Sequence, residues 1–583
     1  MNRNTEAHFS KLPNVKIQRS LFDRSTQNKL SLPVGKLIPI FADEYLPGDT
    51  FTLDTNIVIR TTSPFVKPVM DNLYADIYYF SVPNRLVWVH WKNFMGENTT
   101  GPWVQSTEYT IPQINAPSNG WDVGTIADYF GIPTKVSGIS ISALWFRAYA
   151  LIWNEYFRDE NLMNFTNISN GDGTITGGNQ YSIEQGAQQG AIPLPVCKFH
   201  DYFTSALPNT QKGNPVEINL TTGTAPVYGN GAALSLTWGQ YGQDSDTYIG
   251  ALTTDSNGKL TIAKTVSGSS GTGELPGNYQ PGATPTAYAT NVTEMTIGVP
   301  DKTKVTTSSL NGSAGLYADL SGVQQVININ QLREAFALQR LLEKDARGGT
   351  RYIELIKAHF NVNSPDARLQ RPEYLGGKRI PINIDQVVQM SGTESSSGPQ
   401  QTPQGNVSGY SLTTDKSSSF TKSFTEHGMI IGLMCIRYEH TYQQGINRMF
   451  SRKRRYDYYW PALANLGEQP IYIKEIKATG TTTDDNVFGF QERWAEYRYK
   501  PSQICGQMRN NATNNFAVYH FADSYSSSPS LGQSWIQEDA ANVRRTLSVT
   551  TSNYDPFIAD IYFSYRCARP MPTYSVPGLI DHF

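Results

Sequence analysis

Cysteine is scarce in this chain of 583 residues, and its spacing argues against a disulfide-bonded framework and against a zinc-binding protein. The four cysteines, Cys197, Cys435, Cys505 and Cys567, lie far apart and form no C-x-x-C pair. A disulfide framework or a zinc site is therefore not expected. Buried free thiols in a reducing compartment are expected instead. The most apolar run, residues 429–436, is too short to cross a bilayer, and the first residues contain no apolar signal segment. We expect a soluble protein that is made in a cytoplasm.

Signatures of catalysis are missing as well. The Gly-Asp-Gly at 171–173 lacks the third glycine of a dinucleotide fingerprint, and the Gly-Gly-Lys at 376–378 lacks the upstream glycine of a phosphate loop. No G-x-S-x-G or H-E-x-x-H motif is present. The eight histidines are scattered, and Glu492 and Glu496 lie among arginines, which indicates structural ion pairs. The chain is therefore predicted not to be an enzyme and to need no cofactor, while binding of a metal ion stays open.

Two further gaps mark an inserted segment. No arginine occurs between Arg158 and Arg333, and no phenylalanine between Phe203 and Phe336. Within this window, residues 212–322 consist mostly of Gly, Thr, Ser, Asn and Ala, with short runs of strand-forming residues. So little bulky apolar content makes a thin core at best. A flexible linker is the alternative, but the segment is long and regularly dotted with strand formers, so we expect a surface-projecting β-rich insertion.

The rest of the chain favours a mainly β fold. Its 48 Gly, 33 Pro and 33 Tyr indicate many turns and many half-buried aromatic positions. Residues 51–60 alternate in polarity, and the strand-like residues 75–81 are nearly repeated at 559–564, so both ends of the chain can enter one sheet. Helical spacing is confined to residues 140–158 and to about 330–360. Strands separated by insertions of unequal length predict a jelly roll with elaborated loops.

The same patterns predict how the chain is organised. Residues 1–36 carry seven Lys or Arg against two acidic residues and show no apolar period, which indicates a basic N-terminal arm, with a disordered tail as the alternative. Residues 37–211 are expected to form the first part of the jelly roll with a helical insertion. Residues 323–583 are expected to form the remainder, and the Ser/Gly/Gln-rich residues 391–419 a mobile loop.

One segment combines the densest positive charge with aromatic rings. Residues 451–460 run Ser-Arg-Lys-Arg-Arg-Tyr-Asp-Tyr-Tyr-Trp. Cations beside rings suit single-stranded nucleic acid, because phosphates meet Arg or Lys while bases stack on the rings. The alternative is an interface with a neighbouring subunit. The candidate DNA-facing residues, three of them from the basic arm, are Lys11, Lys16, Arg19, Arg452, Lys453, Arg454, Arg455 and Tyr456.

A second segment, residues 488–502, is rich in aromatics, Arg and Glu, the residue types that make desolvated contacts between large surfaces. Its interleaved charges would fix the register between subunits more than add affinity. The candidate subunit-interface residues of the two segments are Tyr458, Tyr459, Trp460, Phe490, Glu492, Arg493, Trp494, Glu496, Tyr497, Arg498 and Tyr499.

Several motifs, in order along the chain, resemble the major capsid proteins of gokushoviruses, a branch of the single-stranded DNA bacteriophages of the Microviridae. The motifs are residues 17–24, residues 201–208 with 211–213, residues 426–428 with 442–445, residues 457–461 with 466–469, and residues 488–502. A further proline would be expected near Asn209 and Thr210, which is a small departure. Residues 212–322 do not look familiar, and such insertions are the variable part of that family.

The resemblance implies a single eight-stranded jelly roll and a T=1 icosahedral shell of sixty copies of the chain. It implies that the large insertion forms protrusions at the three-fold axes, suited to host attachment through a surface receptor such as a glycan. It also implies an arm on the shell interior, a circular single-stranded DNA genome, a small basic DNA-packaging protein, a pilot protein and an internal scaffolding protein. The location would be the virion, assembled in the host bacterial cytoplasm. A carbohydrate-binding, adhesive β protein that forms no closed shell is the alternative.

Overall fold

The computed structural model describes two compact units, residues 1–213 with 342–583 and residues 214–341. Within them the described residues are 18–98, 107–214, 227–229, 234–237, 248–254, 260–266, 316–318, 329–348, 354, 357–359, 370–395, 398–550 and 554–574. No described helix is long and apolar enough to cross a membrane.

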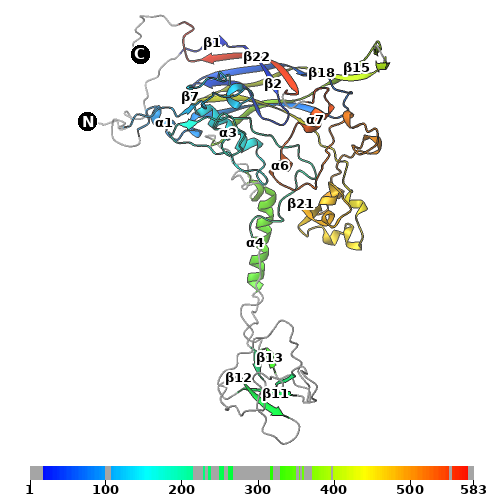
Figure 1. The fold of residues 1–583 in the computed structure, drawn as a ribbon. Helices are drawn as coiled ribbons and strands as arrows, with labels where there is room; N and C mark the ends of the chain where they lie inside the picture. The colour runs from blue at the N-terminus through cyan, green and yellow to red at the C-terminus, as the bar shows by residue number, and fades with distance from the viewer. Residues whose placement is uncertain are drawn as a thin grey trace, which may run out of the picture. The chain divides into compact units, whose positions relative to one another are not determined.

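The first unit is built on two antiparallel sheets (Figure 1). One has the order β2 (Thr26–Leu32), β22 (Phe557–Arg569), β4 (Thr50–Thr61) and β18 (Val407–Ser423), with β1 (Ser20–Asp23) and β15 (Ile384–Val388) at its edges. The other has the order β3 (Ile38–Tyr45), β19 (Gly428–Tyr438), β5 (Leu73–Pro83) and β14 (Glu373–Pro381). Most neighbours within each sheet are distant along the chain and consecutive strands mostly change sheet, a connectivity consistent with the predicted jelly roll. The mainly β prediction is confirmed.

A hydrophobic core fills the space between the two sheets. In β4 every second side chain from Phe51 to Ile59 is buried, and in β22 every second one from Phe557 to Cys567. The alternate positions of both strands are exposed or half-buried, so this sheet covers the core with one face only. The alternation in polarity at residues 51–60 therefore correctly predicted a strand with one buried face.

The central strand β19 of the second sheet is buried on both faces, which explains the apolar run 429–436. Ile430, Met434 and Ile436 of β19 enter the core between the sheets. Met429, Ile431, Leu433 and Cys435 enter a second core that includes α3 (Leu144–Ile152). A strand covered on both faces has no polar alternation to preserve.

Short elements surround this second core and the loops that follow it. They are α1 (Trp91–Phe94), β6 (Gln113–Asn115), α2 (Ile126–Tyr129), β7 (Ser140–Ser142), a π-helical turn at Trp153–Phe157, β8 (Ile175–Thr176), α6 (Gln533–Ile536) and α7 (Ala541–Thr546). The predicted helix at 140–158 is thus shorter than expected. Its first residues pair with β6 as β7, and α3 begins only at Leu144.

Two predicted boundaries are wrong. The jelly roll begins before residue 37, because β1 and β2 of the predicted arm pair with β22. The predicted mobile loop 391–419 is ordered as strands: β16 (Thr393–Ser395) pairs with β17 (Gly398–Thr402), and β18 pairs with β15 and then β4. Small polar residues suit β18 because the buried Ser411 and Thr413 face inward while their neighbours are more exposed.

The second unit, residues 214–341, nearly coincides with the predicted insertion at 212–322. Its described strands form an antiparallel sheet of β10 (Leu234–Thr237), β11 (Tyr248–Thr254) and β12 (Leu260–Val266), and a pair of β9 (Val227–Gly229) with β13 (Leu316–Ala318). Helix α4 (Ile329–Gly348) begins in this unit, and Glu354 and residues 357–359 are also helical, as the pattern at about 330–360 predicted.

Candidate subunit-contact surface and basic pocket

A third small core anchors the predicted contact segment 488–502 through Phe488 and Ala495. It contains Tyr202, Phe203, Tyr442, Ile471 and Phe488 among its buried members. Above it, β20 (Glu468–Tyr472) pairs with β21 (Val487–Glu492), with Pro470 opposite Phe490. The main chains of Phe490 and Leu207 exchange hydrogen bonds of 2.8 and 2.7 Å. The motifs at 201–208, 466–469 and 488–502 therefore meet in one place.

A close backbone contact explains the glycine of the motif at 442–445. A side chain at Gly445 would place its Cβ 1.9 Å from the main-chain oxygen of Glu475. The neighbouring Ile446 donates its N–H to the carbonyl of Lys474 at 2.8 Å. Only glycine allows this approach, so the motif fixes the path of the chain into the contact segments.

Trp494 is buried within this region, although the sequence predicted it as a residue of the subunit contact surface. Its side chain is 5% exposed, and its backbone φ of 65° lies in the left-handed region. The indole lies edge-on to the ring of Tyr459, with the ring centres 5.7 Å apart. Phe490 is likewise half-buried in its strand. Neither side chain is fully exposed for contact with a neighbouring subunit.

Glu496 is the electrostatic link between the two segments. Its carboxylate accepts a hydrogen bond from Gln469 at 2.6 Å and pairs with Arg452 at 3.4 Å and Arg448 at 3.8 Å. The guanidinium of Arg452 also lies over the rings of Tyr458 and Tyr497, at 5.3 and 4.4 Å from their centres. The Arg452 side chain therefore already has partners within the subunit, and it is not an unpaired cation exposed to DNA.

Arg455 is engaged in a similar way. Its guanidinium lies 4.6 Å from the ring centre of Trp460, whose indole N–H donates to the main-chain oxygen of Arg455 at 3.1 Å. Arg498 pairs with Glu492, and both side chains are half exposed. Such exposed pairs contribute little stability, so their role is better sought in orientation.

The remaining predicted rings form an exposed group, here called the aromatic surface. Its members all expose more than a third of their area: Tyr456, Tyr458, Tyr459, Trp460, Tyr497 and Tyr499. Met449, Phe450 and Leu466 of the same loops are also exposed. Apolar groups gathered in this way on a protein surface mark a protein–protein contact.

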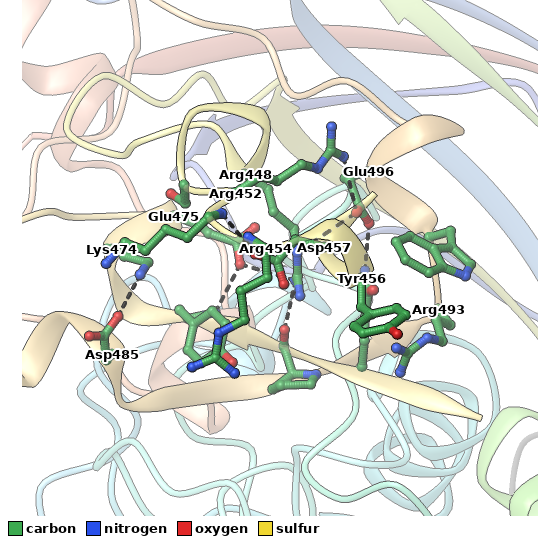
Figure 2. Close-up of a pocket in the computed structure, with 16 residues that line it drawn as sticks. Arg448, Arg452, Arg454, Tyr456, Asp457, Lys474, Glu475, Asp485, Arg493 and Glu496 are labelled. Carbon is green, nitrogen blue, oxygen red and sulfur yellow. Dashed lines mark hydrogen bonds and ion pairs between the residues drawn. The ribbon is translucent and has the colours of Figure 1, made fainter. Parts of the chain in front are cut away.

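A basic pocket of about 610 Å³, shown in Figure 2, shares Tyr456 with the aromatic surface. Lysine and arginine side chains line it from residues 448–454, 474 and 493, among four carboxylates. Burial raises the pKa of Glu475, and this effect is opposed by Arg448. Main-chain N–H groups of Lys453 and Arg454 lower the pKa of Asp457. The pocket thus joins part of the predicted DNA-facing set to part of the predicted interface set.

The other predicted DNA-facing residues lie elsewhere. Lys11 and Lys16 are outside the described residues. Arg19 is exposed and contacts the main-chain oxygen of Gly48, so it is not part of the pocket. Among the described residues, no group of three or more His, Cys, Asp or Glu side chains could hold a metal ion.

Sequence reasoning missed a buried charge network around His440. Its ring nitrogens lie 2.9 Å from the carboxylate of Asp523 and 3.1 Å from that of Glu538. Burial alone lowers the pKa of His440, but the two carboxylates outweigh it and raise the pKa to about 9. Burial also opposes ionisation of Asp523, yet His440 and Lys198 bring the pKa of Asp523 down to about 2. The partners lie 83 and 98 residues away, so no local motif announces them.

Comparisons with known proteins agree with this picture. Residues 10–579 match the family model described as "Capsid protein (F protein)". The chain is 41% identical to the capsid protein VP1 of Chlamydia phage 1, over 98% of this chain and 97% of that protein. It is 40% identical to the capsid protein VP1 of Bdellovibrio phage phiMH2K, over 100% and 99% of the two chains. It is 38% identical to the capsid protein VP1 of Spiroplasma virus 4, over 99% and 98%. The chain belongs to the gokushovirus capsid protein family, as a structural, non-enzymatic protein of the phage virion.

Proposed function

We propose that this capsid protein assembles as sixty copies into a T=1 icosahedral shell that encloses a circular single-stranded DNA genome. The observation that carries the proposal is the aromatic surface. Its six rings are exposed on the subunit although their loops pack on the buried Trp494 and on the third core. A neighbouring copy would remove them from water.

The energetics of a closed shell suit such a surface. Tyr and Trp are enriched among the residues that dominate binding energy at interfaces. Each contact can be weak, because closure multiplies it over every copy and symmetry repeats the same patch. Half-exposed ion pairs such as Arg498 with Glu492 would align neighbours more than hold them.

The second unit is the part of the chain that we propose for host attachment. Residues 214–341 form a compact unit of their own, separate in the chain from the jelly roll. An insertion of this kind would project outward at the three-fold axes and meet a surface receptor such as a glycan. The basic arm would face the interior, where the genome, a small basic packaging protein, a pilot protein and an internal scaffolding protein act with the shell.

Expression of the chain with its neighbouring phage genes tests the proposal. Negative-stain electron microscopy should show small uniform icosahedral particles with surface knobs, and nuclease treatment should leave circular single-stranded DNA protected inside. Monomers or small rings, despite a folded protein, would contradict it. Glycan binding by such small oligomers would then favour the adhesive alternative.

A further inference from the structure

The basic pocket contains more positive charge than the subunit itself neutralises. Six cationic side chains line it, against the four carboxylates of Asp457, Glu475, Asp485 and Glu496, an excess of two positive charges. The cationic residues are Arg448, Arg452, Lys453, Arg454, Lys474 and Arg493. A concave site with such an excess favours an anionic ligand.

The four carboxylates are already occupied by groups of the subunit. Glu496 accepts from Gln469 and pairs with Arg452 and Arg448. Glu475 accepts from the main chain of Tyr472 at 3.0 Å and from Arg448 at 3.3 Å, and Asp485 pairs with Lys474. These ion pairs appear as dashed lines in Figure 2.

Asp457 is occupied in another way. It accepts the main-chain N–H groups of Lys453 and Arg454 at 2.8 and 2.7 Å, which turns the loop, and it forms no ion pair within 4 Å with either side chain. Within the described chain, the side chains of Lys453, Arg454 and Arg493 form no ion pair within 4 Å, although Lys453 and Arg454 act on Asp485 and Asp457 from a greater distance. The Nε atoms of Arg452 and Arg493 are buried and have no hydrogen-bond acceptor there. Two guanidiniums from different segments therefore lack the acceptor that such donors require when buried.

The pocket also offers a ring. Tyr456 lines it, is 66% exposed, and makes no ring contact in the described chain. A volume of about 610 Å³ lies within the range of roughly 300–1,000 Å³ that suits a small ligand or one unit of a polymer. Guanidinium forks bind phosphate in a bidentate way, and a tyrosine ring can stack on a base.

We propose that this pocket binds one nucleotide unit of a single-stranded nucleic acid. Arg454, Arg493 and Lys453 hold the phosphate, and Tyr456 stacks on the base. The inference rests on the proposed function, because the enclosed genome supplies the strand. It adds a place on the subunit, formed by three chain segments, where the strand is held without reading its sequence.

The test is binding of a fluorescent 20-nucleotide oligodeoxythymidylate to the full chain before assembly, followed by anisotropy over a range of salt concentrations. The Lys453→Gln/Arg454→Gln variant should bind about tenfold more weakly, and its salt slope should fall by about 0.7, the contribution of the one phosphate contact that the pocket makes to a single strand. Arg493→Gln alone removes one of the three cations on that phosphate and should lower the slope by less than about 0.7. The matched control is Arg60→Gln/Lys416→Gln, which removes one exposed Arg and one exposed Lys elsewhere and should bind within about twofold of the parent.

A second readout locates the base. A strand carrying 5-iododeoxyuridine should cross-link to Tyr456 on irradiation, as identified by mass spectrometry of the peptides. Equal binding by the pocket and control variants, together with no cross-link at Tyr456, would overturn the proposal. Displacement of the strand by inorganic phosphate at similar concentrations would also overturn it, because the site would then bind free anions.

Particle counts separate this proposal from the proposed function. If the pocket variant forms normal particles with normal DNA content and binds the strand as the parent does, the pocket assignment fails and the shell stands. If the parent forms no particles, the shell fails while the binding curves still decide the pocket. If the pocket variant binds the strand normally but forms no particles, the pocket belongs to the subunit contact and the proposal is wrong.

Discussion

The indole N–H of Trp494 donates a hydrogen bond of 3.1 Å to the main-chain oxygen of Leu463. This bond joins the loop that follows residues 451–460 to the segment 488–502, and the two bonded residues lie 31 positions apart. The tryptophan is buried, so it acts on the aromatic surface through the fold of the loops.

Replacing this tryptophan should therefore reduce stability before it affects assembly. Trp494→Ala should lower the free energy of unfolding by about 3–5 kcal/mol, because a large side chain leaves a cavity. Urea denaturation measures this. The control is Trp460→Ala, since the more exposed Trp460 should cost less than about 1 kcal/mol. Similar losses in both variants would contradict the supporting role.

The aromatic surface should matter for assembly and not for folding. Tyr459→Ser should leave the melting temperature nearly unchanged and abolish particles in electron microscopy. Tyr562→Ser is the matched control, because Tyr562 is 46% exposed on the outer face of β22 while Tyr459 is 48% exposed. Normal particle yield from Tyr459→Ser, or equal loss from both variants, would place the subunit contact elsewhere.

His440 should be essential for stability, because its charge neutralises buried carboxylates. His440→Gln leaves the buried carboxylate of Glu538 without its cation and that of Asp523 with Lys198 alone, at 4.0 Å, which should cost about 3–5 kcal/mol of unfolding free energy. His90→Gln is the control, because His90 also lies 2.9 Å from a carboxylate, that of Asp172, but with a side chain 35% exposed against 1% for His440. The control should lose less than about 1 kcal/mol. Equal losses would show that burial of the pair has no consequence.

The same network predicts a pH dependence. The pKa of His440 is about 9 in the folded chain, above its usual 6.5, so its contribution is complete below about pH 6.5 and is lost as pH rises through 9. The pKa of Asp523 is lowered to about 2, so its contribution is present above about pH 4 and is lost as pH falls toward 2. The urea concentration at the unfolding midpoint of the parent should decrease as the pH rises from 6.5 to 9.5. In His440→Gln this fall should be smaller, and parallel curves would argue against the network.

The close contact at Gly445 gives a sharp steric prediction. Gly445→Ala would force its Cβ against a main-chain oxygen, so the motif loop must move and several kcal/mol should be lost, on the order of 2–4. Gly532→Ala is the control, because a Cβ there meets nothing within 4 Å and the backbone is extended. Thermal melting of both variants decides, and an unchanged melting temperature for Gly445→Ala would contradict the packing.

Removal of residues 220–315 should separate attachment from assembly. The deletion lies within the second compact unit, so the jelly roll should still fold and particles should still form. Host-cell binding of these particles, compared with that of intact particles, should fall strongly. Unchanged attachment would count against a receptor role for this unit.

The sequence predicted the parts of the fold that follow from local pattern. The alternation at 51–60 became β4, and the compositional gap at 212–322 became a separate unit. It failed for 391–419, because a strand with one weakly buried face carries the same small polar residues as a loop. It also placed Trp494 at the surface, since a signature rich in aromatics does not reveal which ring faces inward. The His440 network needed contacts across 83 and 98 residues, which only the folded chain supplies.

The pairing of β22 with β2 and β4 has a consequence for synthesis. Residues 26–32 and 50–61 gain their shared partner only when residues 557–569 have left the ribosome. Until then their edges and inward apolar side chains stay uncovered, so the nascent chain is vulnerable to aggregation for most of its translation. Folding dominated by such distant pairings is also intrinsically slow. The yield of shells in an infected cell should therefore be limited by chaperone capacity as much as by the contacts between finished subunits.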